Sequence, residues 1–133
     1  MKRLTPNLIV DAIEPCLPFW EALGFERIAE VPHGGALGFV GLAHGEAEVM
    51  YQTKASLLDD LPEAAPEAID HGSVSFFVEI DVPFEDLVAM IGKTEAEVLI
   101  PDRMTFYGAR EIAVRTPDGV FVVFASFDEA GEA

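Results

Sequence analysis

Histidine and cysteine, the side chains most often used in nucleophilic and metal chemistry, are few in this chain: three histidines and one cysteine among 133 residues. The sequence has no Ser-His-Asp or Cys-His spacing, phosphate-binding loop or redox dithiol. Because Cys16 is alone, it excludes an internal disulfide and a multi-cysteine zinc site, and we interpret it as a small buried apolar residue. His33 and His44 lie in turn-like sequences, which favours surface or capping roles.

The element best suited to position a site is a hairpin in the last third of the chain. Two apolar runs rich in β-branched and aromatic residues flank Thr116-Pro117-Asp118-Gly119. Proline presets φ for the turn, aspartate can bond its own backbone, and glycine accepts a positive φ. The pattern predicts a β-hairpin with Arg115 opposite Val120, and this pairing would put Arg110 on the face of Val123.

The rest of the chain has the same pattern of elements twice. In the first half, a capping-box spacing of Asp11 and Glu14 predicts a helix that ends at Gly24. In the second half, apolar residues at i, i+3, i+4 and i+7 predict a helix over residues 84–91, closed by Gly92. We expect strands at residues 4–10, 25–31, 36–42, 47–52, 73–80, 97–100, 110–115 and 120–127, and at most a short helical turn at 54–58.

Strand–helix–strand–strand–strand therefore occurs twice, with Val10-Asp11 and Ile80-Asp81 in equivalent places. This duplication predicts an α+β fold of two tandem βαβββ modules. We expect residues 1–133 to form a single domain, with module one at about 4–60, an acidic linker at about 61–70 and module two at about 71–127.

Charge limits the choice of partners. Aspartate and glutamate number 24 against 8 lysines and arginines, a net charge of −16. No basic patch could neutralise phosphates, so nucleic acid is an unsuitable partner. The charge would attract a cationic ligand, or serve solubility alone. No segment could span a membrane and residues 1–6 lack a signal-peptide pattern, so we expect a cytoplasmic protein with no membrane partner.

The sequence resembles the vicinal oxygen chelate superfamily, which includes glyoxalase I, bleomycin-resistance proteins and extradiol dioxygenases. The similar segments are residues 17–25 (LPFWEALGF), residues 78–81 (VEID), and Tyr107-Gly108-Ala109-Arg110-Glu111 leading into Pro117-Asp118-Gly119. The resemblance implies two βαβββ modules whose curled mixed sheets surround a shared cavity, with helices outside. It also implies a homodimer.

Enzymes of this superfamily hold a divalent metal through His and Glu side chains on the first and last strands of each module. The resemblance places Thr5, Met50, Ser73 and Val123 at those positions. Met and Val offer nothing to a hard cation, and hydroxyls are weak neutral donors, so we expect no metal and no cofactor. A two-residue slip would instead bring Glu48 and His71 into an atypical metal site.

Strand alternation from those four positions assigns further side chains to the inner face. Such a lining of apolar walls with a few polar groups would suit a small organic ligand, unless the side chains fill the cavity themselves. Arg110 could grip a carboxylate, or pair with Glu48 or Glu111 as a structural bridge. The candidate ligand-binding residues are Thr5, Asn7, Glu48, Met50, Gln52, Ser73, Ser75, Phe77, Tyr107, Arg110 and Val123.

Three functions are open from the sequence. The first, which the missing metal ligands favour, is a metal-independent small-molecule binding protein of the bleomycin-resistance or glyoxalase-like type. The second is an enzyme, such as a lyase or dioxygenase with a non-standard metal site. The third is a dimeric structural or regulatory protein whose pocket is vestigial.

Overall fold

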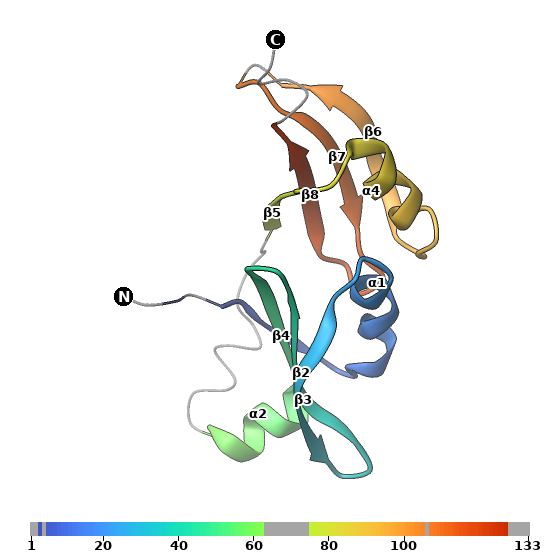
Figure 1. The fold of residues 1–133 in the computed structure, drawn as a ribbon. Helices are drawn as coiled ribbons and strands as arrows, with labels where there is room; N and C mark the ends of the chain where they lie inside the picture. The colour runs from blue at the N-terminus through green and yellow to red at the C-terminus, as the bar shows by residue number, and fades with distance from the viewer. Residues whose placement is uncertain (1–2, 4, 63–74, 106, 128–133) are drawn as a thin grey trace. The chain divides into compact units, whose positions relative to one another are not determined.

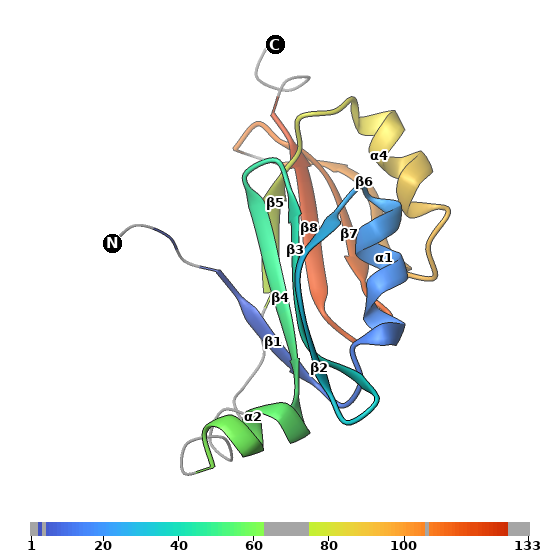
Figure 2. The ribbon, with the colours of Figure 1, turned by 60° about the horizontal axis from the view of Figure 1, so that its bottom comes forward.

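The computed structural model describes residues 3, 5–62, 75–105 and 107–127. The chain forms two compact units, Met1–Gly72 and Ser73–Ala133. Each unit contains one four-stranded sheet, and the described residues include more than one helical segment in the first unit and one helix in the second (Figure 1, Figure 2).

The first unit contains a helical segment between its first two strands and a second helix after its last strand. The helical segment begins as a 3-10 turn and continues as α1. The elements in chain order are β1 (Asn7–Val10), η1 (Glu14–Cys16), α1 (Leu17–Ala22), β2 (Glu26–His33), β3 (Ala36–His44), β4 (Ala47–Thr53) and α2 (Lys54–Asp60).

The second unit repeats the order of the first. The described elements are β5 (Ser75–Glu79), α4 (Phe84–Ile91), β6 (Glu97–Met104), β7 (Arg110–Arg115) and β8 (Phe121–Ser126). The α4 helix has the bounds that its apolar spacing predicts, and it buries Phe84, Leu87 and Ile91.

The two sheets have the same topology. Their strand orders are β1-β4-β3-β2 and β5-β8-β7-β6. In each sheet the first strand pairs in parallel with the last, and the other pairs are antiparallel. The α+β class and the tandem βαβββ modules that the sequence predicts are therefore confirmed.

The core of the first unit lies between α1 and one face of its sheet. Trp20 on α1 donates a 2.8 Å hydrogen bond from Nε1 to the hydroxyl of Tyr51 on β4, and both side chains are buried. The Trp20 ring also makes edge contacts with Phe19 and Phe25, each with a centroid separation of 5.0 Å. Such pairs add to the stability that apolar burial supplies.

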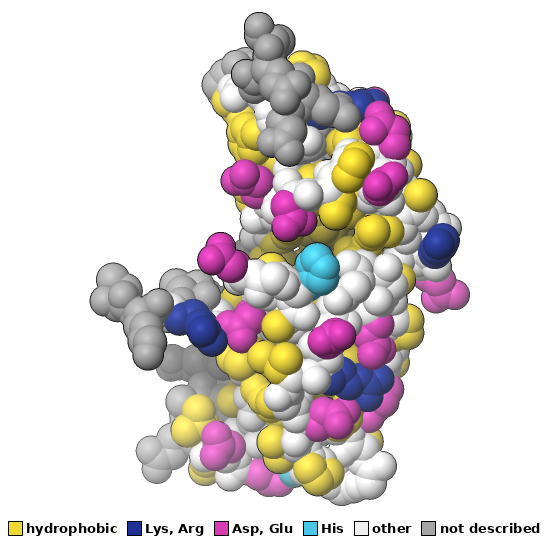
Figure 3. All heavy atoms as spheres, in the orientation of Figure 1, with side chains coloured by type: hydrophobic (Ala, Val, Ile, Leu, Met, Phe, Trp, Pro, Cys, Tyr) yellow, Lys and Arg dark blue, Asp and Glu magenta, His cyan; other side chains and the backbone are white. Residues whose placement is uncertain are grey.

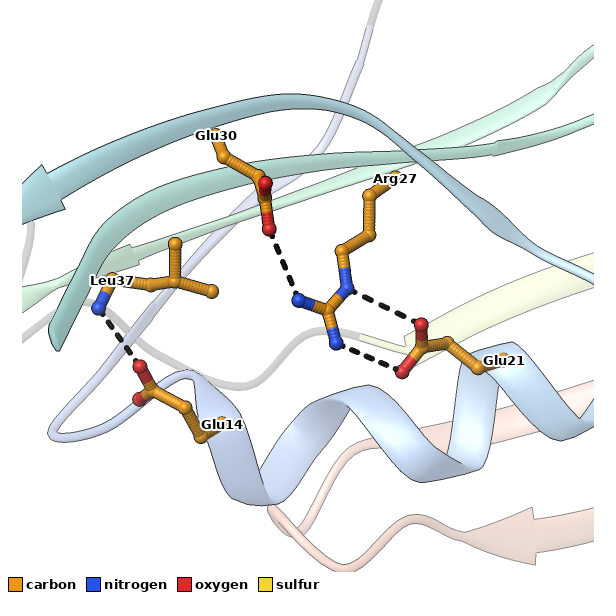
Figure 4. Close-up of polar contacts among 5 residues, drawn as sticks. All are labelled: Glu14, Glu21, Arg27, Glu30 and Leu37. Carbon is orange, nitrogen blue, oxygen red and sulfur yellow. Dashed lines mark hydrogen bonds and ion pairs between the residues drawn. The ribbon is translucent and has the colours of Figure 1, made fainter.

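The capping box expected at Asp11 and Glu14 does not form, because the helix begins later and has no side-chain cap. The Glu14 carboxylate instead accepts a 2.8 Å hydrogen bond from the backbone N–H of Leu37 at the start of β3 (Figure 4). That bond holds the pKa of Glu14 below its usual value. Glu14 therefore joins the helix to the β2–β3 hairpin rather than closing its own helix.

A second polar link joins α1 to the sheet. Arg27 on β2 donates from Nε to Glu21 on α1 at 3.2 Å and from Nη1 to Glu30 at 3.0 Å (Figure 4). Because both carboxylates favour the charged guanidinium, they raise the pKa of Arg27. All three side chains are exposed, so the link orients the helix more than it stabilises the unit.

Two boundaries in the first unit differ from the sequence prediction. Strand β2 continues through His33, and the turn is made by Gly34 and Gly35, which have φ values of +66° and +92°. The short turn expected at 54–58 is a helix of seven residues, α2. Its N-cap is Thr53, whose hydroxyl accepts a 3.1 Å hydrogen bond from the N–H of Ser56.

The hairpin of β7 and β8 has a register one residue away from the predicted one. Arg115 pairs with Phe121, because Val120 is held within the loop. The N–H of Thr116 donates to the carbonyl of Val120 at 2.9 Å, and the Thr116 hydroxyl oxygen accepts from the Val120 N–H at 2.9 Å. A one-residue shift moves every side chain of a strand to the opposite face relative to its partner.

None of the described helices is long and apolar enough to cross a membrane. Acidic side chains occur on the drawn face of both units, next to few basic ones (Figure 3).

Candidate functional site

The two faces of the second sheet have different roles. Arg110 on β7 lies over the ring of Phe84 on α4, 4.2 Å from its centroid, so the Arg110 face is the one that α4 covers. Val122 and Phe124 on β8 share that face through their pairs on β7. The opposite face carries Phe77, and we call it the Phe77 face. Its residues on strands β5, β7 and β8 are Ser75, Phe77, Glu79, Glu111, Ala113, Arg115, Phe121, Val123 and Ala125.

The prediction that Arg110 shares a face with Val123 is therefore wrong. Arg110 pairs with Ser126, whereas Val123 pairs with Ala113, one position out of phase. The Arg110 guanidinium donates to Asp102 at 2.8 and 3.0 Å and to Glu85 at 2.9 Å. These two carboxylates lie on β6 and α4 of the same unit. Arg110 joins the sheet to α4.

Glu111 occupies the centre of the charged network on the Phe77 face. Its side chain is 1% exposed, yet it lies directly opposite Arg103 of β6. Arg103 donates to Glu111 Oε1 from Nε at 2.9 Å and lies 2.8 Å from it through Nη2. The hydroxyl of Tyr107 donates to Glu111 Oε2. Both carboxylate oxygens thus have partners, which a buried charge requires.

This network alters the two side chains that Glu111 binds. The hydrogen bond to the carboxylate raises the pKa of the Tyr107 hydroxyl, since ionisation would place two negative charges together. The same carboxylate raises the pKa of Arg103. Although Glu111 is buried, the Arg103 side chain is 52% exposed, so its guanidinium is available to a molecule in solution.

Three aromatic rings lie beside this network. The ring centroids of Phe77 and Phe127 are 6.4 Å apart, and those of Tyr107 and Phe127 are 6.3 Å apart. Phe77 is 56% exposed and Tyr107 is 44% exposed. Large exposed aromatic side chains next to charged groups are typical of binding sites. We call Phe77, Tyr107 and Phe127 the ring cluster.

In the first unit, the pairing puts Asn7 next to Met50, with Glu48 and Gln52 on the same face by alternation. We call it the Met50 face. Asn7 donates to Gln52 at 3.1 Å, and Gln52 donates to Ser56 at 3.2 Å. The opposite face of β4 carries the buried Tyr51 that α1 covers.

The other expected residues of the first unit lie at its border. Glu48 pairs with Arg3 at 2.9 Å, and Thr5 precedes β1 and is half-buried. Ser73 and His71 lie outside the described residues.

The expected residues of the second unit lie on the Phe77 face or next to it. Ser75, Phe77 and Val123 share this face of the second sheet, with Tyr107 beside it.

The donor set at the metal-ligand positions does not fit a divalent metal. Among the described positions, Met50 and Val123 have no hard donor and Thr5 has only a hydroxyl. In the part of the chain that the structure describes, no three His, Cys, Asp or Glu side chains gather into a metal-binding group. We therefore derive no chemistry through a metal at these positions.

Sequence reasoning missed Arg103, Glu111 and Phe127 as site residues. Glu111 follows Arg110 in a strand whose other side was assumed to face inward, so alternation assigned it to the outside. A usable signal was present: Arg103 on β6 and Glu111 on β7 have opposite charges, and cross-strand pairing could bring them together. The sequence prediction ended this strand at Ile100, whereas β6 continues through Met104. Arg103 was therefore not recognised as part of the strand.

The fold and this arrangement can be compared with known proteins. No protein-family model matches the chain, and no curated protein matches it either. Solved structures do match over nearly the whole chain. TioX from Micromonospora sp. ML1 has a TM-score of 0.75 and 16% identity, covering 96% of this chain and 99% of TioX.

Two further structures carry the family description in their names. A glyoxalase/bleomycin resistance protein/dioxygenase family enzyme from Burkholderia phytofirmans PsJN has a TM-score of 0.74 and 16% identity, covering 92% of this chain and 96% of that one. A glyoxalase/bleomycin resistance protein/dioxygenase from Nocardioides has a TM-score of 0.70 and 18% identity, covering 95% and 83%.

The chain thus has the fold of the glyoxalase/bleomycin resistance/dioxygenase proteins, which is consistent with the vicinal oxygen chelate superfamily that its sequence resembles. At these identities the likeness concerns the fold, and the function has to be argued from the residues of this chain.

Proposed function

We propose that this protein binds a small, planar organic molecule without a metal, in the manner of a bleomycin-resistance or glyoxalase-like binding protein. The observation that carries the proposal is the Phe77 face, where exposed aromatic rings lie beside a satisfied charged network. Flat rings supply a large apolar contact area at low conformational cost, and polar groups at their border fix orientation.

The Met50 face supports the same proposal. It combines the apolar Met50 with Gln52 and Asn7, whose amide groups can donate or accept hydrogen bonds. On the Met50 face of the first unit, the proposed ligand contacts are Thr5, Asn7, Glu48, Met50 and Gln52. In the second unit, taken by itself, they are Ser73, Ser75, Phe77, Tyr107 and Val123. Arg110 is not included, because it is engaged with α4.

A thermal-shift screen of small metabolites and antibiotics, run with a chelator present, tests this function. We expect planar, partly aromatic compounds to raise the melting temperature, with dissociation constants in the micromolar range, about −8 kcal/mol of binding free energy. A broad library that yields no stabilising compound would contradict the proposal.

Substitutions then show whether a compound from the screen uses the Met50 face. Met50→Glu would place an unpaired acid against an apolar wall and should weaken binding at least tenfold. Met104→Glu is the matched control, because Met104 is exposed and pairs with Arg110 on the other face of the second sheet. Equal effects of the two variants would argue against the Met50 face.

A further inference from the structure

The ring cluster and Arg103 define the chemistry that one end of the ligand should have. The rings of Phe77, Tyr107 and Phe127 offer apolar surface, and Arg103 is the exposed charged group bound to the network beside them. Glu111 is buried and already accepts from Arg103 and Tyr107, so a cation could reach it only by displacing both partners.

Arg103 is well suited to bind an anion. A guanidinium has five N–H donors arranged in a fork that matches a carboxylate. The contacts with Glu111 use Nε and Nη2 on a single carboxylate oxygen, and half of the side chain stays exposed. Because Glu111 holds the guanidinium through Nε and Nη2, and Tyr107 also interacts with Arg103, the orientation of Arg103 is fixed before a ligand arrives, which lowers the entropy that binding would cost.

We propose that the ring cluster and Arg103 form a subsite for an aromatic carboxylate, with the ligand ring against Phe77, Tyr107 and Phe127 and its carboxylate on Arg103. Glu111 is a positioning residue that holds Arg103 and Tyr107. This inference rests on the proposed function and names the ligand class of the same site. It also moves the carboxylate-binding role that the sequence suggested for Arg110 to Arg103.

The chain contains a natural control for Arg103. Arg115 and Glu97 form the same kind of cross-strand pair between β7 and β6, at 3.1 Å. The Arg115 side chain is 52% exposed, the same fraction as Arg103. The Glu97 side chain, however, is 65% exposed, whereas Glu111 is buried. Arg103→Ala and Arg115→Ala thus remove the same charge from equally exposed positions.

Three probes of similar shape make the test: naphthalene-2-carboxylate, naphthalene-2-carboxamide and 2-(aminomethyl)naphthalene, each titrated into the full chain by calorimetry. We expect the carboxylate to bind at least tenfold more tightly than the carboxamide, since a charge-assisted hydrogen bond replaces a neutral one. Arg103→Ala should abolish that preference by weakening the carboxylate far more than the carboxamide, and Arg115→Ala should leave the preference as in the wild type.

The positioning role of Glu111 has its own readout. Glu111→Gln keeps the shape of the side chain but removes the charge that holds Arg103, so the carboxylate preference should fall while the carboxamide still binds. If Glu111→Gln weakens both probes equally, Glu111 is merely structural. If the variant does not fold, Arg103→Lys replaces it: a point charge in place of the fork should reduce the preference.

Other results would overturn the inference. Glu79 is exposed and lies in the same row of the sheet as Glu111, with Ala125 between them. If the amine binds more tightly than the carboxylate, Glu79 is the recognition group and the ligand is a cation. If the library yields ligands but none of the three probes binds, the subsite is wrong while the proposed function stands. If neither a library compound nor any of the three probes binds, the subsite and the proposed function are both wrong.

Discussion

At the scale of single residues, the burial of Glu111 is the feature that most affects its neighbours. A carboxylate that is 1% exposed needs partners for both oxygens, and Arg103 and Tyr107 supply them. The consequence for Tyr107 is a raised hydroxyl pKa, since the neutral hydroxyl donates to the carboxylate. The folded state thus favours the neutral form of the Tyr107 hydroxyl, which is the form present below its pKa.

A spectrophotometric pH titration checks this effect. Tyr107 should ionise above the ordinary tyrosine value of about 10, and Glu111→Gln should lower its pKa. Because the pKa is raised in the folded state, the hydrogen bond contributes stability below the unfolded pKa and loses it as pH rises through the folded pKa. Tyr51→Phe identifies the signal, since the chain has two tyrosines. A Tyr107 pKa at or below 10 in the wild type would contradict the network.

At the scale of elements, β3 shows how closely strand and helix approach. A methyl group added at Gly38 would lie 2.5 Å from Cβ of His33 and 3.2 Å from Cβ of Ser56, on β2 and α2. At Gly41, three residues along the same strand, the nearest atom would be 3.4 Å away. Gly38 is therefore a position where only glycine fits, whereas Gly41 has ordinary contact distances.

We expect Gly38→Ala to lower the free energy of unfolding by about 1–3 kcal/mol, the usual cost of overpacking. Gly41→Ala is the matched control and should cost less. Urea denaturation of both variants measures the difference. If Gly41→Ala proves as costly as Gly38→Ala, the close approach of His33 and Ser56 does not govern stability.

The elements also show what a sequence can predict. Helix α4 was predictable to the residue, because its apolar spacing and Gly92 define both face and end. The bounds of β7 were predictable as well. The pairing register of β7 and β8 was not predictable. It depends on hydrogen bonds that Thr116 makes within the loop, and these shift the register by one residue. That single shift reversed the assignments of Arg110 and Glu111.

At the scale of the whole molecule, the duplication was predictable from the repeated order of elements, and the two sheets have identical strand orders. Whether Met50 and Val123 could bind a hard cation can be judged without coordinates, because neither side chain has a hard donor. The network of Arg103, Tyr107 and Glu111 was not readable, because it joins three residues across two strands and a loop.

We also propose that the protein is a homodimer. Edge strand β2 is exposed along most of its length and carries Ile28 and Val31, 58% and 52% exposed. Exposed apolar edge strands are prone to pair with another chain. Sedimentation equilibrium should give about twice the chain mass of 14.4 kDa. Val31→Lys should weaken the dimer, whereas Val88→Lys on α4 should not; a monomeric wild type at micromolar concentration would contradict the proposal.

The central claim is that this chain binds a planar organic ligand with its own side chains and without a metal. The measurement that tests it most directly is calorimetric titration of the best compound from the screen into protein whose bound metal has been determined by elemental analysis, before and after exhaustive chelation. We predict the same dissociation constant, within about twofold, before and after chelation and after added Mn²⁺, Ni²⁺ or Zn²⁺, because Thr5, Met50 and Val123 offer no ligand set for a metal. Loss of binding on chelation, restored by one equivalent of a divalent metal, would contradict the account.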